Sequence, residues 1–133
     1  MTVGPLGRDD ETATFLDGTA RGELLLRRCR DGHWSEPAAM CCSTCYSAEL
    51  TWEAASGAAS LVSWAVTHSR PADGTAGTRR VLAVVELAEG PWWWTSLVDV
   101  TPEQAVVGMP LQVAFERASA EHEAVPVFGP LSP

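Results

Sequence analysis

Residues 79–100 read RRVLAVVELAEGPWWWTSLVDV and contain two apolar runs separated by the four residues AEGP at positions 88–91. The first run, residues 81–87, is rich in β-branched side chains and too short for a typical helix, which indicates a strand covered on both faces. The Gly-Pro pair predicts a turn. Because the second run resumes at Trp92 with aromatic and β-branched residues, the stretch predicts a β-hairpin. We expect this hairpin to form the middle of a small antiparallel barrel.

Length and composition limit what the rest of the chain can be. The 133 residues are enough for one hydrophobic core, and a hydrophobic content of 46% with six tryptophans indicates a packed globular protein. No apolar run approaches the roughly 20 residues that a membrane span requires. The first residues, MTVGPLGRDDETATF, lack the basic and then apolar segments of a secretory signal. We therefore expect a cytoplasmic protein with reduced thiols and no membrane contact.

The charge balance is acidic. Nine basic residues, all of them arginine, face 17 acidic ones, for a formal net charge of -8. A protein that binds nucleic acid mainly through phosphates needs a basic surface, so a nucleic-acid partner is disfavoured.

Outside the hairpin, periodicity and turn residues predict one helix and further strands. We expect a short helix at residues 10–20, where acids precede Phe15 and glycines follow. A strand at residues 60–68 places Val62, Trp64 and Val66 on one face, and Gly57 before it fits a bend or bulge. Thr101-Pro102 predicts a single helical turn. Two last strands are expected at residues 111–115 and 124–128.

All four cysteines lie between positions 29 and 45. In a reduced compartment such clustering favours a metal site over disulfides, and Cys42-Ser43-Thr44-Cys45 has the spacing of a zinc knuckle. The partner knuckle is incomplete, because Gly32 stands where a second cysteine would follow Cys29. Tetrahedral zinc could be completed by Cys29, Cys42, Cys45 and either His33 or Cys41. The alternative is a ribbon without metal, held by packing of Trp34, Pro37 and Met40.

Two aromatic features are candidates for contacts with a partner. Trp92, Trp93 and Trp94 are consecutive, so in a strand Trp93 points away from the other two, and at least one of the three should be exposed or covered by a partner. The alternative is that the N-terminal helix covers this apolar surface. His68 ends the strand that carries Trp64. A stand-alone enzyme using His68 or an open zinc site remains a competing hypothesis, although no second catalytic group accompanies it.

Together these elements make a mainly β protein: a short helix and a small zinc-ribbon-like element in residues 1–48, then a five-stranded OB-fold barrel with a C-terminal arm in residues 49–133. The sequence resembles the OB-fold family with an N-terminal rubredoxin-like zinc ribbon, formerly a domain of unknown function, whose members accompany thiolase-like enzymes that act on acyl-CoA. The resemblance spans nearly the whole chain. It is carried in order by Phe15-Leu16-Asp17-Gly18, Arg28-Cys29, Cys42-Ser43-Thr44-Cys45, Ser63-Trp64-Ala65-Val66-Thr67-His68, Val84-Val85-Glu86-Leu87, Leu97-Val98-Asp99, Gly108-Met109-Pro110-Leu111 and Pro126-Val127-Phe128.

The resemblance implies a subunit that is not catalytic alone. Its partner would be a thiolase, an acyltransferase or a lipid-transfer-protein-like aldolase acting on acyl-CoA thioesters, including those of steroid side-chain degradation and other lipid metabolism. A hydratase subunit is a further expected partner. The chain would help to form or order the acyl-CoA site. The competing function is a nucleic-acid-binding OB module, which the aromatic residues favour and the charge opposes.

Contacts with acyl-CoA or the partner are expected from arginines and aromatic side chains. Arginine suits the phosphates of a nucleotide-like carrier. The alternative for each arginine is that it is solvated or pairs with one of the many acids. The candidate contact residues are Arg27, Arg28, Arg30, Trp64, His68, Arg79, Arg80, Trp92, Trp93 and Trp94.

Overall fold

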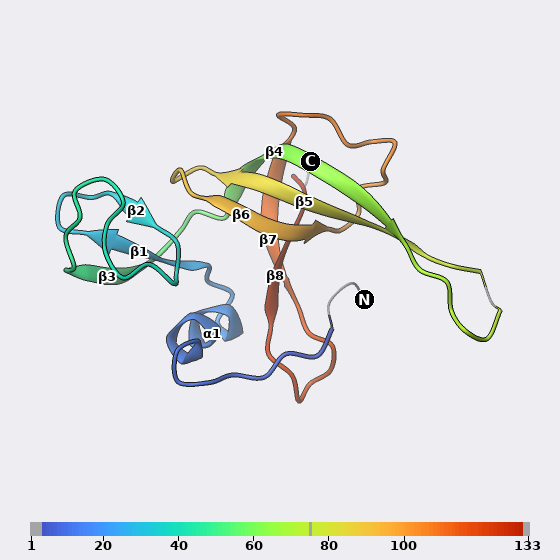
Figure 1. Cartoon of the computed structure of the whole chain (residues 1–133), viewed down its shortest axis with the longest axis horizontal. Helices are drawn as coiled ribbons and strands as arrows, with labels where there is room; N and C mark the ends of the chain where they lie inside the picture. The colour runs from blue at the N-terminus through green and yellow to red at the C-terminus, as the bar shows by residue number, and fades with distance from the viewer. Residues whose placement is uncertain (1–3, 75, 132–133) are drawn as a thin grey trace.

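A computed structural model describes residues 4–74 and 76–131. It contains a small three-stranded sheet beside a closed five-stranded barrel, with the single described helix below them (Figure 1). The elements are α1 (Ala13–Ala20), β1 (Leu25–Cys29), β2 (Trp34–Ser35), β3 (Leu50–Ala54), β4 (Ala58–His68), β5 (Arg79–Leu87), β6 (Trp92–Leu97), β7 (Pro110–Glu116) and β8 (Val125–Pro130). Within the described residues, no helix has the length and apolar character needed to cross a membrane.

The helix begins three residues later than the sequence predicts. Residues 10–12 form a turn instead, in which the Asp9 carboxylate accepts hydrogen bonds from the Thr12 backbone N–H and hydroxyl, each at 2.9 Å. These bonds, the hydroxyl bond first, hold the pKa of Asp9 below its usual value. The helix packs closely on β1, because a Cβ at Gly18 would lie 2.6 Å from Leu25 Cδ1. A side chain at position 18 would therefore displace the buried Leu25 side chain.

The three-stranded sheet has the order β2-β1-β3, and all its pairs are antiparallel. β3 pairs with β1 along its whole length, from Leu25 opposite Ala54 to Cys29 opposite Leu50. The sheet thus extends six residues beyond the expected boundary after residue 48. Leu24, just before β1, and Leu26 within it are buried in the same cluster as the barrel residues. One hydrophobic core therefore joins the ribbon to the barrel.

The barrel has the strand order β4-β5-β6-β8-β7 and closes through pairing of β7 with β4. All neighbours are antiparallel except β6 and β8, which meet in parallel at Leu97 and Phe128. This is the expected five-stranded OB barrel. The hairpin β5–β6 lies at its centre as predicted, with Val85 opposite Trp93.

A bulge in β4 changes which side chains face the core. The register with β5 shifts between Leu61 and Ser63, which leaves Val62 as the extra residue. As a result Leu61 is fully buried and Trp64 also packs against the core. The strict alternation predicted for residues 60–68 is therefore interrupted between Leu61 and Ser63. The expected bend at Gly57 is present, with φ 87°.

The helical turn predicted after β6 is a single hydrogen-bonded turn. The Gln104 backbone N–H donates to the Thr101 carbonyl at 3.0 Å. In return the Thr101 N–H donates to Gln104 Oε1 at 2.9 Å. This side-chain bond resembles one half of a helix capping box, but no regular helix follows it.

Candidate metal centre and exposed aromatic surface

Four side chains of the ribbon converge at the end of β1. The Sγ atoms of Cys29, Cys42 and Cys45 and a ring nitrogen of His33 all lie within 4.8 Å of one another. Cys29 Sγ is 3.3 Å from His33 Nδ1 and 3.7 Å from Cys45 Sγ. Ligands around tetrahedral zinc, at about 2.3 Å for sulfur and about 2.0 Å for nitrogen, are separated by roughly 3.5–3.8 Å. The donor set and its spacing therefore fit a zinc ion.

The β1–β2 turn places a histidine where the missing cysteine of the first knuckle would stand. The turn is closed by hydrogen bonds from the Gly32 N–H to the Cys29 carbonyl and from the Cys29 N–H to the His33 carbonyl, each at 3.0 Å. Gly32 has φ 89°, a conformation that favours glycine. The first knuckle is thus one residue longer than Cys-x-x-Cys, and the longer imidazole side chain of His33 reaches the three sulfurs. Of the two alternatives for the fourth ligand, the structure supports His33, since Cys41 is exposed and outside the cluster.

The second knuckle favours the thiolate form of Cys42. Its sulfur accepts the backbone N–H groups of Cys45 at 3.5 Å and Thr44 at 3.3 Å. These bonds, the one from Cys45 first, lower the pKa of Cys42 to about 6. The chain then turns away at Tyr46, which has φ 61°. Since thiolate is the form that binds metal, this loop is prepared for a ligand role.

The number of candidate ligands indicates whether zinc at this site would be structural or catalytic. Three thiolates and one imidazole would fill all four tetrahedral positions, which is typical of a structural site and would leave no open position for water or substrate. When bound, the ion supplies a cross-link among β1, the β1–β2 turn and the loop that follows β2. The hypothesis of an enzyme with an open zinc site is not supported by this geometry.

Exchanging the two candidate ligands tests the assignment. We expect purified Cys41→Ser to retain one zinc per chain and His33→Ala to retain much less, because only His33 lies among the sulfurs. Metal analysis after dialysis against a weak chelator measures the difference. Full retention by His33→Ala together with loss by Cys41→Ser would reverse the assignment.

The structure places the five candidate arginines in two separate groups. Arg27 and Arg28 lie on β1, where their guanidinium groups stack 4.5 Å over the Trp52 ring and 4.8 Å over the Trp34 ring, respectively. Arg28 also forms a 2.8 Å ion pair with Glu53. These two side chains therefore have roles within the ribbon itself, and a guanidinium stacked on an aromatic ring is held in one orientation.

The remaining arginines are on the surface. Arg30 forms an ion pair with Glu49, and Arg79 forms one with Glu103, each at 2.7 Å. Arg80 is exposed beside Arg79, at the end of the β4–β5 hairpin away from the ribbon (Figure 1). Three of the five arginines, Arg28, Arg30 and Arg79, are thus paired with acidic side chains. Their contact with acyl-CoA stays a prediction.

The three consecutive tryptophans divide as the strand geometry predicts. The Trp93 ring points inward and stacks on Phe15 of α1, with ring centroids 5.8 Å apart. Trp92 and Trp94 point outward and are 62% and 83% exposed. The helix therefore covers one of the three, and the other two remain on the surface. Trp64 is half-buried against the core and His68 is exposed at the end of β4, so neither joins the outward pair.

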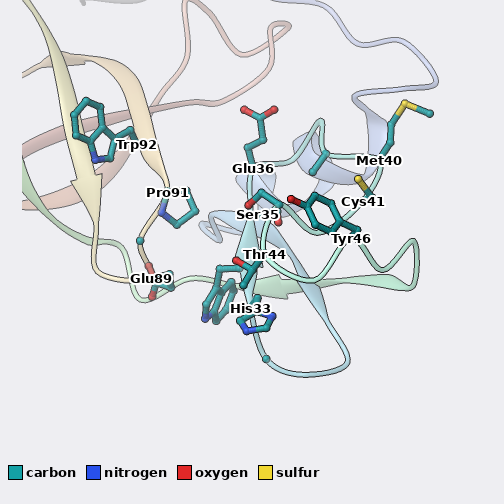
Figure 2. Close-up of a pocket in the computed structure, with 15 residues that line it drawn as sticks. His33, Ser35, Glu36, Met40, Cys41, Thr44, Tyr46, Glu89, Pro91 and Trp92 are labelled. Carbon is teal, nitrogen blue, oxygen red and sulfur yellow. The ribbon is translucent and has the colours of Figure 1, made fainter.

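A groove of about 860 Å³ separates the ribbon from the β5–β6 turn. Figure 2 shows Glu89, Pro91 and Trp92 of the turn on one side and the ribbon residues His33, Ser35, Glu36 and Tyr46 on the other. The groove and its ribbon wall are not apparent from the sequence. No local pattern signals it, because it exists only where residues 32–46 and residues 89–92 meet in the fold.

Two buried polar atoms belong to residues that line this groove. Glu89 Oε2 accepts the Ser56 N–H at 2.9 Å, which ties the hairpin turn to the segment between β3 and β4. Glu89 Oε1 and Ser35 Oγ are buried, and neither has a hydrogen-bond partner among the described residues. Because Oε1 is buried, it does not open onto the groove, and Glu89 acts through Oε2, which holds the hairpin turn.

Known proteins share both halves of this structure. Residues 16–51 match the rubredoxin-like zinc ribbon domain of ChsH2, and residues 52–116 match its C-terminal OB-fold domain. A solved structure described as "Ltp2-ChsH2(DUF35) aldolase" is 28% identical, with a TM-score of 0.77, over 93% of this chain and 97% of the matched chain.

Two curated relatives agree with this match. A "Probable enoyl-CoA hydratase alpha subunit" of Thermomonospora curvata is 29% identical over 92% of this chain and 38% of its own length. A "DUF35 domain-containing scaffold protein" of Pyrococcus furiosus is 29% identical over 71% of this chain and 69% of its own length. The chain thus spans well under half the length of the first relative. With its ribbon, its barrel and its Cys/His cluster, the chain belongs to the DUF35 family of ChsH2-type zinc-ribbon and OB-fold proteins.

Proposed function

We propose that this protein is the accessory subunit of a thiolase-like or lipid-transfer-protein-like enzyme that acts on acyl-CoA thioesters. The observation that carries the proposal is the match to the Ltp2-ChsH2(DUF35) aldolase, which covers 97% of the matched chain. The likeness to a hydratase alpha subunit and to a scaffold protein supports the same role. Catalysis of carbon–carbon bond formation or cleavage would then reside in the partner.

The side chains of this subunit fit a supporting role. Its Cys/His cluster has four protein ligands for a tetrahedral ion, and His68, the other candidate for catalysis, is an exposed residue at a strand end. The exposed aromatic side chains offer a surface for association. We propose further that the partner requires this subunit to form or order its acyl-CoA site. In that case Arg30, Arg79 and Arg80, all accessible, are the arginines available to the CoA phosphates.

Reconstitution tests the proposal. A tagged chain is purified from its native cells, and any protein recovered in stoichiometric amount is identified by mass spectrometry. We expect a thiolase-fold subunit, and we expect turnover of acyl-CoA only when both proteins are present. The substrate panel includes short-chain, long-chain and steroid side-chain thioesters. Turnover by this chain alone, or recovery of nucleic acid in place of a thiolase-fold protein, would overturn the proposal.

A further inference from the structure

Five of the exposed large apolar side chains lie along two neighbouring hollows that together span both halves of the molecule. Met40 and Tyr46 on the ribbon side of the groove are 90% and 78% exposed, and Trp92 stands on the hairpin side. Trp94 lies two positions after Trp92 in β6 and therefore on the same outward face. Together with Leu82 of β5 it lines a second hollow of about 300 Å³. We call these five residues the apolar band: Met40, Tyr46, Trp92, Trp94 and Leu82.

The size of the band indicates an interface. A tryptophan or tyrosine side chain buries about 150–250 Å² on contact, so three of them with a methionine and a leucine approach the largest apolar patch of a typical monomer. Aromatic residues of this kind dominate the energy of protein interfaces. Trp93 has a partner within the chain, because its ring stacks on Phe15. Trp92 and Trp94 point the other way.

The acidic side chains beside the band indicate the charge of the partner that covers it. Glu36 and Glu89 line the groove, and Glu86 lies directly opposite Trp92 in the β5–β6 register. Within the described residues, no arginine lines either hollow. A second copy of this chain would bring the same carboxylates together, and each copy carries a net charge of -8. Like charges placed against each other at an interface oppose association.

We infer that the apolar band is the docking surface for the enzyme subunit of the proposed function, and that this subunit presents an apolar patch bordered by Lys or Arg. The basic side chains of the partner would face Glu36, Glu86 and Glu89, which lie beside the band. Because the band crosses from ribbon to barrel, the partner would clamp the two halves together. The inference rests on the proposed function, and its test separates the two.

The test uses the thiolase-fold subunit recovered with the wild-type chain, purified separately, as the probe. Its dissociation constant is measured for wild type, Trp92→Ala, Trp94→Ala and the matched control Val107→Ala. Val107 is equally apolar and 67% exposed, but it lies in the β6–β7 loop. We expect each tryptophan variant to bind at least about thirty-fold more weakly, as for a central interface residue, and the control to bind like wild type. Circular dichroism checks that all four proteins are folded.

A charge-reversal pair tests the chemistry of the partner. Glu86→Arg is expected to weaken binding at least about ten-fold and to remove part of its salt dependence, whereas Glu121→Arg, in the β7–β8 loop, should not. Recovery of no thiolase-fold subunit by wild type would overturn the proposed function. Binding of that subunit equally well by Trp94→Ala and Val107→Ala would overturn the docking surface alone. A wild-type homodimer that Trp94→Ala dissociates would assign the band to a second copy instead.

Discussion

Replacing Cys42 by serine is expected to release the metal and to lower the free energy of unfolding by several kcal/mol. Binding of structural zinc is folding free energy, with apparent values of about 10–16 kcal/mol in small zinc-finger peptides. Cys42 is fully buried at the centre of the cluster, and its sulfur accepts two backbone N–H groups. A serine hydroxyl is a poor zinc ligand, and its oxygen reaches less far than the cysteine sulfur. Thermal unfolding followed by circular dichroism, with metal analysis of the same samples, measures both losses.

The neighbouring residue supplies the control for this prediction. Cys41→Ser makes the same chemical change one position earlier, at an exposed side chain outside the cluster. We expect it to keep both the zinc and the melting temperature of wild type. Prolonged treatment with a strong chelator should reproduce the Cys42→Ser melting temperature in the wild-type chain. A metal-free wild-type protein with an unchanged melting temperature would show that packing of Trp34 and its neighbours holds the ribbon.

The loss of stability in Cys42→Ser should extend from the ribbon to the barrel. Leu24 and Leu26 at the base of β1 are buried in one cluster with Leu61, Val85 and Phe128 of the barrel. A disordered β1 would withdraw both leucines, and each fully buried leucine contributes roughly 1.5–3 kcal/mol through burial. We therefore expect Cys42→Ser to unfold in a single transition at lower temperature, not in two separate transitions.

Much of the fold could be predicted because local patterns and tertiary structure agree there. The β5–β6 hairpin has β-branched strands, a Gly-Pro turn and a tryptophan triplet whose alternation follows from strand geometry alone. The barrel and the zinc ribbon follow from the order of such segments and from the spacing Cys42-Ser43-Thr44-Cys45. In each case neighbouring residues carry the information. These predictions were confirmed by the structure and by the family match.

Other features depend on contacts between distant segments, and the sequence did not reveal them. The bulge at Val62 shifts the register against β5, so Leu61 and Trp64 both reach the core although strict alternation separates them. His33 and Cys41 were equivalent candidates until the β1–β2 turn placed the imidazole among three sulfurs. The groove joins a hairpin turn to a ribbon loop, and neither segment carries a sign of the other.

Replacing Phe128 by alanine is expected to cost about 3–5 kcal/mol, the usual loss for a buried phenylalanine. Its side chain is fully buried, and the residue lies where β8 joins both neighbours: opposite Val113 of β7 and beside Leu97 of β6. The Phe128 carbonyl also accepts the Val98 N–H at 2.9 Å. The backbone bond survives the substitution, but the cavity removes the packing that supports the one parallel pair. Since β8 is held between β6 and β7, the site has little freedom to collapse around the cavity.

Urea unfolding monitored by tryptophan fluorescence measures this loss, and the chain supplies a contrast of similar chemistry. Trp94→Ala removes a larger aromatic ring from a strand, but at an exposed position, so it should cost at most about 1 kcal/mol. Phe128→Leu retains most of the buried volume and should fall between the two alanine variants. If Phe128→Ala were no less stable than Trp94→Ala, the β6–β8 contact would not depend on this core side chain, and backbone pairing with β7 would have to hold β8 by itself.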